Sequence, residues 1–261
     1  MPLFSATSPL PVNMERRRLF NPSRISGLDL WLDAADGDTL FDATSGGNFV
    51  STNGSAVKRW EDKSGNSRHA IEATSAPTLL TNAKNNFNAL NFATSKYITC
   101  SFTAINYTKQ AVFLVFNYST NALNFARYFS QTVSGNADFT FSGGVIPMLR
   151  NALTNGIGIF KNGTGLVCNV GTANNVWYIA RYLHTGSAMT LRLNAVTSAS
   201  DSHTLNISPN RFRIGADISA VDLASQYANC TVSEVLLYNR NISDSESTQI
   251  TDYLNSKWAV Y

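Results

Sequence analysis

The feature that most constrains this chain is a succession of short strand-like segments separated by turn-forming clusters. In LDLWLDA, residues 28–34, leucines alternate with Asp29, Trp31 and Asp33, a period of two that is typical of a β-strand. Residues 111–118, AVFLVFNY, are apolar on both faces and indicate a central strand. Clusters rich in Asn, Gly and Ser separate the segments. The pattern predicts an all-β, antiparallel two-sheet jelly-roll sandwich. Further strand-like segments follow at residues 176–183, 189–196, 212–216 and 232–239.

Length and charge narrow the class of protein. A chain of 261 residues can fill one sandwich domain, so a second domain is not required. A net charge of +3 with only 14% charged residues does not indicate a nucleic-acid partner. No run reaches the ~18 apolar residues of a membrane span. Cys100, Cys168 and Cys230 are far apart and odd in number, so we expect buried thiols rather than a disulfide framework or a zinc site.

Residues 1–26 differ from the rest of the chain. They hold four of the seven prolines, show little periodicity, and do not have the apolar core of a signal peptide. We predict an extended N-terminal arm over residues 1–26 and a jelly-roll domain over residues 27–261. The arm is either a disordered tail or a strap along a neighbouring subunit. Its candidate partner-binding residues are Arg16, Arg17, Arg18 and Phe20.

The C-terminal end carries the signals of a single helix. Ser243 followed by Glu246 is the S-x-x-E pattern of a capping box. An apolar stripe at helical spacing follows, and it normally packs on a core. The stripe consists of Ile250, Tyr253, Leu254 and Trp258.

Three stretches carry a family resemblance: residues 25–40, residues 57–79 with the core W-x-D-x-S-G-N, and residues 232–258. In order and spacing they resemble the LamG-like jelly-roll modules of the concanavalin A-like lectin/glucanase superfamily. The resemblance implies two antiparallel sheets of about six or seven strands each, packed face to face. It also implies that the C-terminal helix lies against the sandwich.

The opening stretches further resemble modules of virion proteins from bacteriophages and large algal DNA viruses. On that basis we predict a non-enzymatic virion structural protein, a capsid decoration, minor capsid or fibre component at the virion surface. Its arm would bind other virion proteins or a second copy of the chain, and its rim would recognise host glycan. One alternative is a carbohydrate-binding lectin module of a secreted or cell-surface protein. Another is a glycoside hydrolase.

No catalytic residue is predicted. A retaining glycosidase needs two carboxylates about 5 Å apart, and the glucanases place them alternately along one strand. No glutamate here has a second glutamate within five residues. Tyrosine and tryptophan side chains suit saccharide stacking, but the sequence does not separate exposed aromatic residues from buried ones.

An acidic loop is the candidate metal site. Hard oxygen ligands on a loop suit Ca²⁺, and many LamG-type modules bind calcium at one rim of the sandwich. The alternative is a solvated loop in which one aspartate caps a turn. The four candidate ligands are Asp33, Asp36, Asp38 and Asp42.

The W-x-D-x-S-G-N stretch has two interpretations, a ligand-contacting loop and an anchored turn. We favour the turn, with Trp60 in the core, Asp62 accepting backbone N–H groups and Gly65 at positive φ. The structural motif of the family is therefore predicted to comprise Trp31, Trp60, Asp62, Gly65, Ser243, Glu246 and Trp258.

Overall fold

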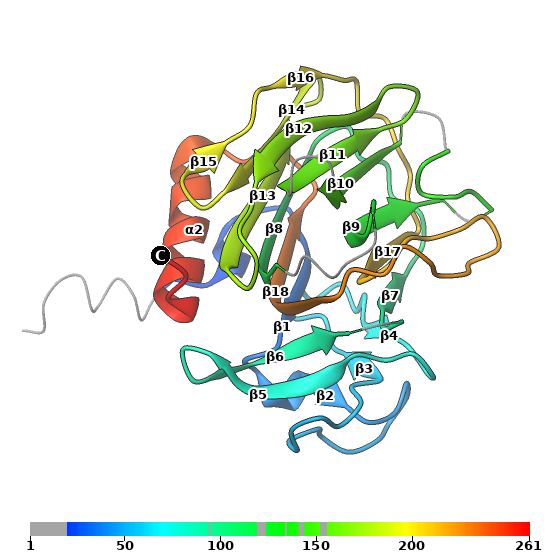
Figure 1. Ribbon diagram of the computed structural model, residues 1–261, viewed down its shortest axis with the longest axis vertical. Helices are drawn as coiled ribbons and strands as arrows, with labels where there is room; N and C mark the ends of the chain where they lie inside the picture. The colour runs from blue at the N-terminus through cyan, green and yellow to red at the C-terminus, as the bar shows by residue number, and fades with distance from the viewer. Residues whose placement is uncertain (1–19, 94, 119–123, 134, 141–143, 152–155) are drawn as a thin grey trace, which may run out of the picture.

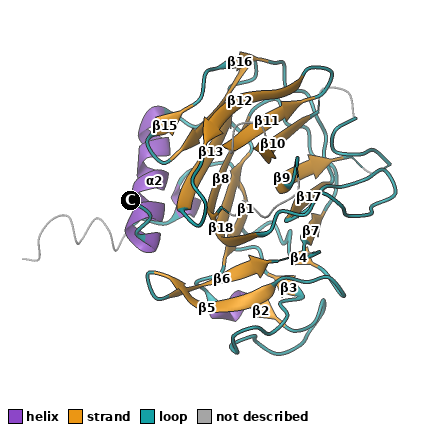
Figure 2. Ribbon diagram, viewed as in Figure 1, coloured by secondary structure: helices purple, strands orange, loops and turns teal. Residues whose placement is uncertain are grey.

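The computed structural model describes residues 20–93, 95–118, 124–133, 135–140, 144–151 and 156–261 (Figure 1). These residues form two antiparallel sheets packed face to face, with one α-helix against the outside of one sheet (Figure 2). The predicted all-β sandwich with a C-terminal helix is confirmed. Within the described residues each sheet has nine strands, more than the six or seven expected, because several pairings involve strands of only two residues.

Sheet A runs from a short edge strand near the helix to the β5–β6 hairpin. β1 and β6 lie end to end beside β18, each pairing with one part of it. In spatial order the strands are β15 (Val196–Thr197), β14 (Ala188–Leu193), β13 (Trp177–His184), β8 (Gln110–Asn117), β18 (Cys230–Tyr238), β6 (Phe87–Phe92) and β5 (Thr78–Lys84), with β1 (Leu28–Asp33) beside β18 and β16 (Asp201–Ser202) beside β14.

Sheet B is the opposing layer, and apart from β17 its strands lie in reverse chain order. It consists of β12 (Gly165–Gly171), β11 (Gly156–Lys161), β10 (Val145–Asn151), β9 (Arg127–Thr132), β17 (Arg211–Ile214), β7 (Ile98–Ser101), β4 (Ala70–Ile71), β3 (Arg59–Trp60) and β2 (Leu40–Phe41).

The core lies between the sheets, and β8 shows why its sequence is apolar on both faces. Val112, Leu114 and Phe116 point into the core between the sheets. Ala111 and Phe113 belong to a second buried cluster on the outer side of sheet A. The strand is therefore buried twice, once by sheet B and once by the helix.

The helix α2 (Asp244–Trp258) packs on the outer face of sheet A. Its capping box is complete, because Ser243 accepts the Glu246 N–H and Glu246 accepts the Ser243 N–H. Ile250, Leu254 and Trp258 are fully or almost fully buried against the sheet. The predicted apolar stripe therefore covers the sheet.

The first described residues pack on the sandwich. The 3₁₀ turn η1 (Pro22–Arg24) brings the Pro22 carbonyl to the Tyr238 hydroxyl, which donates to it at 3.1 Å. Ile25 is buried, and the Phe20 ring lies 5.5 Å from that of Tyr253 on α2. The boundary predicted at residue 27 thus falls within a packed segment. The partner-binding candidates Arg16, Arg17 and Arg18 lie outside the described residues.

Candidate functional site

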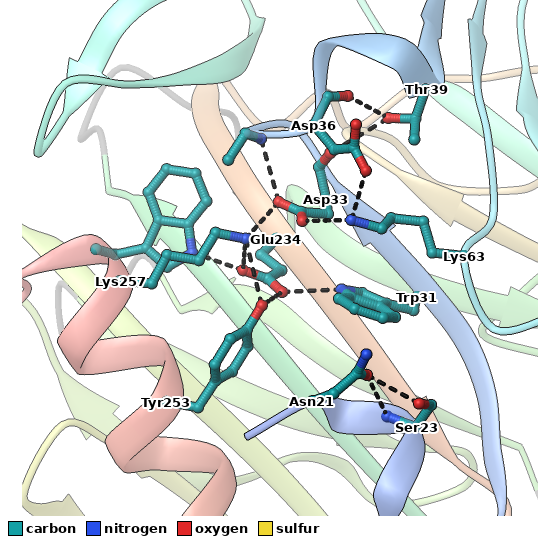
Figure 3. Close-up of polar contacts among 12 residues, drawn as sticks. Asn21, Ser23, Trp31, Asp33, Asp36, Thr39, Lys63, Glu234, Tyr253 and Lys257 are labelled. Atoms are coloured by element: carbon teal, nitrogen blue, oxygen red, sulfur yellow. Dashed lines mark hydrogen bonds and ion pairs between the residues drawn. The ribbon is translucent and has the colours of Figure 1, made fainter. Parts of the chain in front are cut away.

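The acidic loop follows β1 and contains the short turn η2 (Gly37–Thr39). Asp33 sits at the end of β1 and binds two lysines, Lys63 at 2.9 Å and Lys257 at 2.5 Å (Figure 3). Asp36 pairs with Lys63 at 2.7 Å. Asp42 instead accepts the backbone N–H and the side-chain amide of Asn48 in an exposed loop.

The four predicted calcium ligands therefore have different surroundings. Asp38 lies within η2, and two of the other carboxylates are neutralised by lysines. Among the residues that the structure describes, no three Asp, Glu, His or Cys side chains are grouped so that they could hold a metal ion. Calcium binding stays a prediction, and a rise in melting temperature with millimolar Ca²⁺ that Asp36→Ala with Asp38→Ala abolishes would establish it.

Glu234, on β18 opposite Asp33, is the centre of a buried polar network. Its Oε1 accepts from the Trp31 indole and the Tyr253 hydroxyl, each at 2.9 Å (Figure 3). Its Oε2 accepts from the Trp258 indole at 2.7 Å and from Lys257 at 2.9 Å. The carboxylate is fully buried, and these donors replace the water it has lost.

The pKa values of the neighbouring Asp33 and Glu234 carboxyl groups are shifted in opposite directions. Burial raises the pKa of Asp33, but the charges of Lys257 and Lys63 outweigh it and bring the net pKa below its usual value. Burial, together with the charge of Asp33, raises the pKa of Glu234 against the opposing effect of Lys257. Lys257 thus lies between a carboxylate that is readily ionised and one that is readily protonated.

The W-x-D-x-S-G-N stretch forms a tightly bonded turn. Asp62 accepts the backbone N–H groups of Trp31, Ser64 and Arg68 at 2.9, 2.9 and 3.0 Å. Trp60 is fully buried, and Gly65 has a φ of +90°. Asp62 therefore ties the turn to β1, and its carboxylate is occupied by the protein itself.

The outer face of sheet B carries a row of polar and apolar side chains, of which one end is exposed. Its strands are in a register that places one residue from each at the same level on this face. The adjacent row of paired residues faces the core instead, and it includes Leu40, Trp60, Ala70 and Phe212. The outward row runs Phe49, Phe41, Arg59, Ile71, Thr99, Arg213 and Ser130.

One end of this row is open to solvent. Phe49 is 57% exposed and Ile71 is 41% exposed. The Arg59 guanidinium lies 3.9 Å from the centre of the Phe41 ring, which contacts the Phe49 ring at 4.9 Å. Glu61 pairs with Arg59 at 3.1 Å. We call the surface made of Phe41, Phe49, Arg59, Glu61 and Ile71 the platform.

The other end of the row is covered. Arg213 stacks on Tyr97 at 4.5 Å and donates to the Asp217 carbonyl at 2.7 Å. Burial and the Glu72 carboxylate raise the pKa of Tyr97 to about 12, so its hydroxyl stays protonated at neutral pH. The platform was not predicted, because it combines residues from separate strands whose register no local pattern reveals.

Comparisons with known proteins give a fold and no family. No protein-family model matches the chain, and no curated protein matches it. Several solved structures match the chain in fold. Trypanosoma rangeli sialidase in complex with sialic acid aligns with a TM-score of 0.56 and 11% identity over 89% of this chain and 33% of the sialidase. The chain thus spans about a third of that enzyme.

Two further structures align with similar scores. Domain 4 of AbnA, a GH43 extracellular arabinanase from Geobacillus stearothermophilus, in complex with arabinotriose, has a TM-score of 0.56 and 10% identity over 87% of this chain and 97% of the domain. A GH54 α-L-arabinofuranosidase mutant has a TM-score of 0.55 and 13% identity over 79% of this chain and 52% of that chain. At these identities the likeness establishes the fold.

These neighbours correct two predictions. The prediction of a non-enzymatic virion structural protein is contradicted, because the three structures described above, which share the fold, are glycoside hydrolases or parts of them. The prediction that the chain is not an enzyme is contradicted by the same structures. The virion assignment came from a resemblance in the turn and strand motifs around Trp31 and Trp60, which the structure uses to hold the fold together.

Proposed function

We propose that this chain is a carbohydrate-binding β-sandwich domain of a carbohydrate-active protein, a LamG-like member of the concanavalin A-like superfamily. The observation that carries the proposal is the platform on sheet B. It presents the exposed Phe49 ring beside an arginine–glutamate pair of which Glu61 is the more accessible member. Saccharides bind such surfaces by packing their C–H faces on a ring while their hydroxyls bond to neighbouring charged groups.

The comparisons support a saccharide ligand. The arabinanase domain that matches over nearly its whole length was solved in complex with arabinotriose. An isolated sandwich of this size is thus able to hold an oligosaccharide. The fixed position of Arg59 on the platform adds support. Its side chain is held by carbonyls of the neighbouring loop as well as by Glu61, so binding costs little side-chain entropy.

Binding is tested with the full chain against a panel of soluble polysaccharides in affinity gels, and against arabinotriose and sialic acid by calorimetry. We expect retardation by at least one polysaccharide. Phe49→Ala should weaken it about tenfold or more, a loss of at least about 1.4 kcal/mol. Tyr261→Ala is the matched control, because Tyr261 is equally exposed at 57% but follows α2 on the other side of the sandwich. No binding by the wild-type protein, or unchanged binding by Phe49→Ala, contradicts the proposal.

A second candidate function is glycoside hydrolysis, and one observation favours it. Asp138 and Asp217 lie over the covered end of the same face, joined by the bond from the Asp138 N–H to the Ile218 carbonyl. Burial raises the pKa of Asp138 against the opposing charge of Arg127. Asp217 accepts the N–H and hydroxyl of Ser225. Two neighbouring carboxyl groups are the kind of pair that glycosidases use.

Both carboxyls are more than nine-tenths buried, so hydrolysis there requires the covering segment 218–224 to open. The test is release of nitrophenol from a panel of nitrophenyl glycosides. We expect Asp138→Asn and Asp217→Asn each to lower the rate at least a hundredfold, with Asp222→Asn as an exposed control. A wild-type chain with no turnover on any glycoside contradicts this candidate and leaves the binding proposal standing.

A further inference from the structure

The network around Glu234 holds a lysine amine against a carboxyl group in a nearly dry setting. The Lys257 nitrogen lies 2.5 Å from Asp33 Oδ1, so by the length of a C–O bond it is within about 3.7 Å of the Asp33 carboxyl carbon. Both side chains are largely buried, and Trp31, Tyr253 and Trp258 surround them. This cluster lies under α2, away from the platform on sheet B.

We propose that Lys257 and Asp33 condense to an intramolecular isopeptide bond, with Glu234 carrying the proton between them. The bond would join the last turn of α2 to the end of β1, residues 224 positions apart in the sequence. It would be a covalent modification of this chain by its own residues, and it needs no cofactor or oxidant.

The atoms balance as follows. Lys257 begins as an ammonium and passes one proton to Glu234 Oε2, which is 2.9 Å away. The free amine attacks the Asp33 carboxyl carbon, forming the C–N bond. Glu234 returns its proton to Asp33 Oδ1, the nitrogen gives up a second proton to the same oxygen, and that oxygen leaves as water. The products are one amide and one water, and Glu234 ends as the carboxylate it began as.

Neighbouring groups suit each step. Lys63 binds Asp33 Oδ2 at 2.9 Å, where the negative charge of the tetrahedral intermediate would rest. The Ala35 N–H donates to Asp33 Oδ1 at 3.1 Å and holds the carboxyl in place. Glu234 is fully buried and its Oε2 lies 2.9 Å from the Lys257 nitrogen, which places it to carry the proton. Lys63 thus stabilises the charge that develops on Oδ2 but exchanges no proton in these steps.

The scaffold supplies the alignment. Asp33 lies at the end of β1, which pairs with the central strand β18, and Lys257 lies on a helix that is docked along its length. Groups fixed at reacting distance behave as if present at an effective concentration on the order of 10⁵ M or more. An amide that would not form between free side chains in water can therefore form here, where water is excluded.

Intact-mass spectrometry of the purified full chain tests the proposal directly. We expect the wild-type protein to be lighter than its sequence by one water. A protease digest should contain a branched peptide that joins the segment holding Asp33 to the segment holding Lys257. Lys257→Arg keeps the positive charge but cannot condense, so it should have the full mass. Glu234→Gln should condense at least tenfold more slowly.

Two further variants sharpen the result. Asp33→Asn should lose ammonia in place of water and reach the same final mass as the wild-type protein, because the amide product is identical. Lys161→Arg is the matched control, since Lys161 pairs with Asp201 at 2.9 Å in a more exposed ion pair with no buried acid beside it; the missing water should persist. A folded wild-type chain that keeps its full mass after prolonged incubation overturns the proposal, as does a branched peptide at other residues. Neither result depends on whether a variant folds.

Discussion

The buried carboxylates Glu234 and Asp62 are stable because hydrogen-bond donors of the protein occupy their oxygens. Glu234 accepts four hydrogen bonds, and Asp62 accepts three from backbone N–H groups and one from Ser64. Arg68 likewise binds Asp29, whose carboxylate also receives the Tyr107 hydroxyl. An unsatisfied group of this kind costs free energy, so these residues have little freedom to vary.

Asp62 allows this cost to be measured. Asp62→Asn keeps the shape but turns one acceptor oxygen into a donor, which opposes the Arg68 N–H. We expect the free energy of unfolding in urea to fall by about 2–3 kcal/mol. Asp42→Asn is the matched control, because Asp42 makes similar bonds in an exposed loop where water replaces them, and it should change stability little. Equal losses in the two variants would contradict the role assigned to Asp62.

His184 is expected to make the protein sensitive to acid. It is fully buried, its Nδ1 accepts the Gly186 N–H, and its Nε2 lies 3.0 Å from His203 Nδ1. Burial and the neighbouring His203 lower the pKa of His184 from 6.5 to about 4. Between these values the unfolded chain binds a proton that the folded chain does not, so stability is complete above pH 6.5 and falls as the pH drops toward 4.

The expected loss from this residue is about 3 kcal/mol over that range. Urea unfolding at pH 6.5 and at about pH 4 measures it, and His184→Gln should show a smaller loss than the wild-type protein over the same range. The same loss in both proteins would show that other groups cause it.

At this scale the sequence predicts local partners and misses distant ones. The spacing within W-x-D-x-S-G-N predicts that Asp62 caps its own turn, because two of its partners lie two and six residues away. Nothing in the sequence near Glu234 indicates that its hydrogen-bond donor is Trp31, which lies 203 residues earlier. For the same reason, nothing in the sequence near Asp33 indicates its partner Lys257, which lies 224 residues later.

The elements show which patterns carry enough information to be predicted. Helix α2 is fully specified by its own residues: the capping box fixes its start and the spacing of Ile250, Leu254 and Trp258 fixes its buried face. Strand β1 is different. Its alternation places Asp29 and Asp33 on the face opposite the leucines but does not indicate that both are only 4% exposed, because the 60–68 turn and α2 cover them. Periodicity gives the strand but not what lies over it.

The capping box of α2 can be tested in isolation from the core. Ser243→Ala removes the acceptor for the Glu246 N–H and should lower stability by about 1 kcal/mol, seen as a lower melting temperature. Ser256→Ala is the control, an exposed serine in the last turn of the same helix, and it should be neutral or slightly stabilising. If both substitutions have the same effect, the box does not stabilise the helix.

In the whole molecule, a polar contact crosses the core. Gln110 on sheet A and Gln131 on sheet B are both fully buried, and their amides bond to each other at 2.9 and 3.2 Å. Such a reciprocal pair is satisfied only when the two sheets are at the right spacing and register. The strand pattern predicts two sheets, but their pairing order and this link depend on contacts between remote segments and could not be read from it.

This link predicts strong coupling between the two residues. Gln110→Leu should lower the free energy of unfolding by about 2 kcal/mol, because it leaves the Gln131 oxygen buried without a donor. The double variant with Gln131→Leu should cost less than the sum of the single variants, by at least about 1 kcal/mol. Urea unfolding of the four proteins gives the coupling. Additive losses would mean that the amides act independently.

The position of β18 has a consequence for how the chain is made. This strand lies in the middle of sheet A, between β8 on one side and β1 and β6 on the other, yet it follows all three in the sequence. A ribosome releases β1, β6 and β8 long before the strand that joins them. During that interval these apolar strands have open edges, which promote association with other chains. The domain should therefore close only after β18 emerges, and a nascent chain stalled before residue 230 should depend on chaperones to stay soluble.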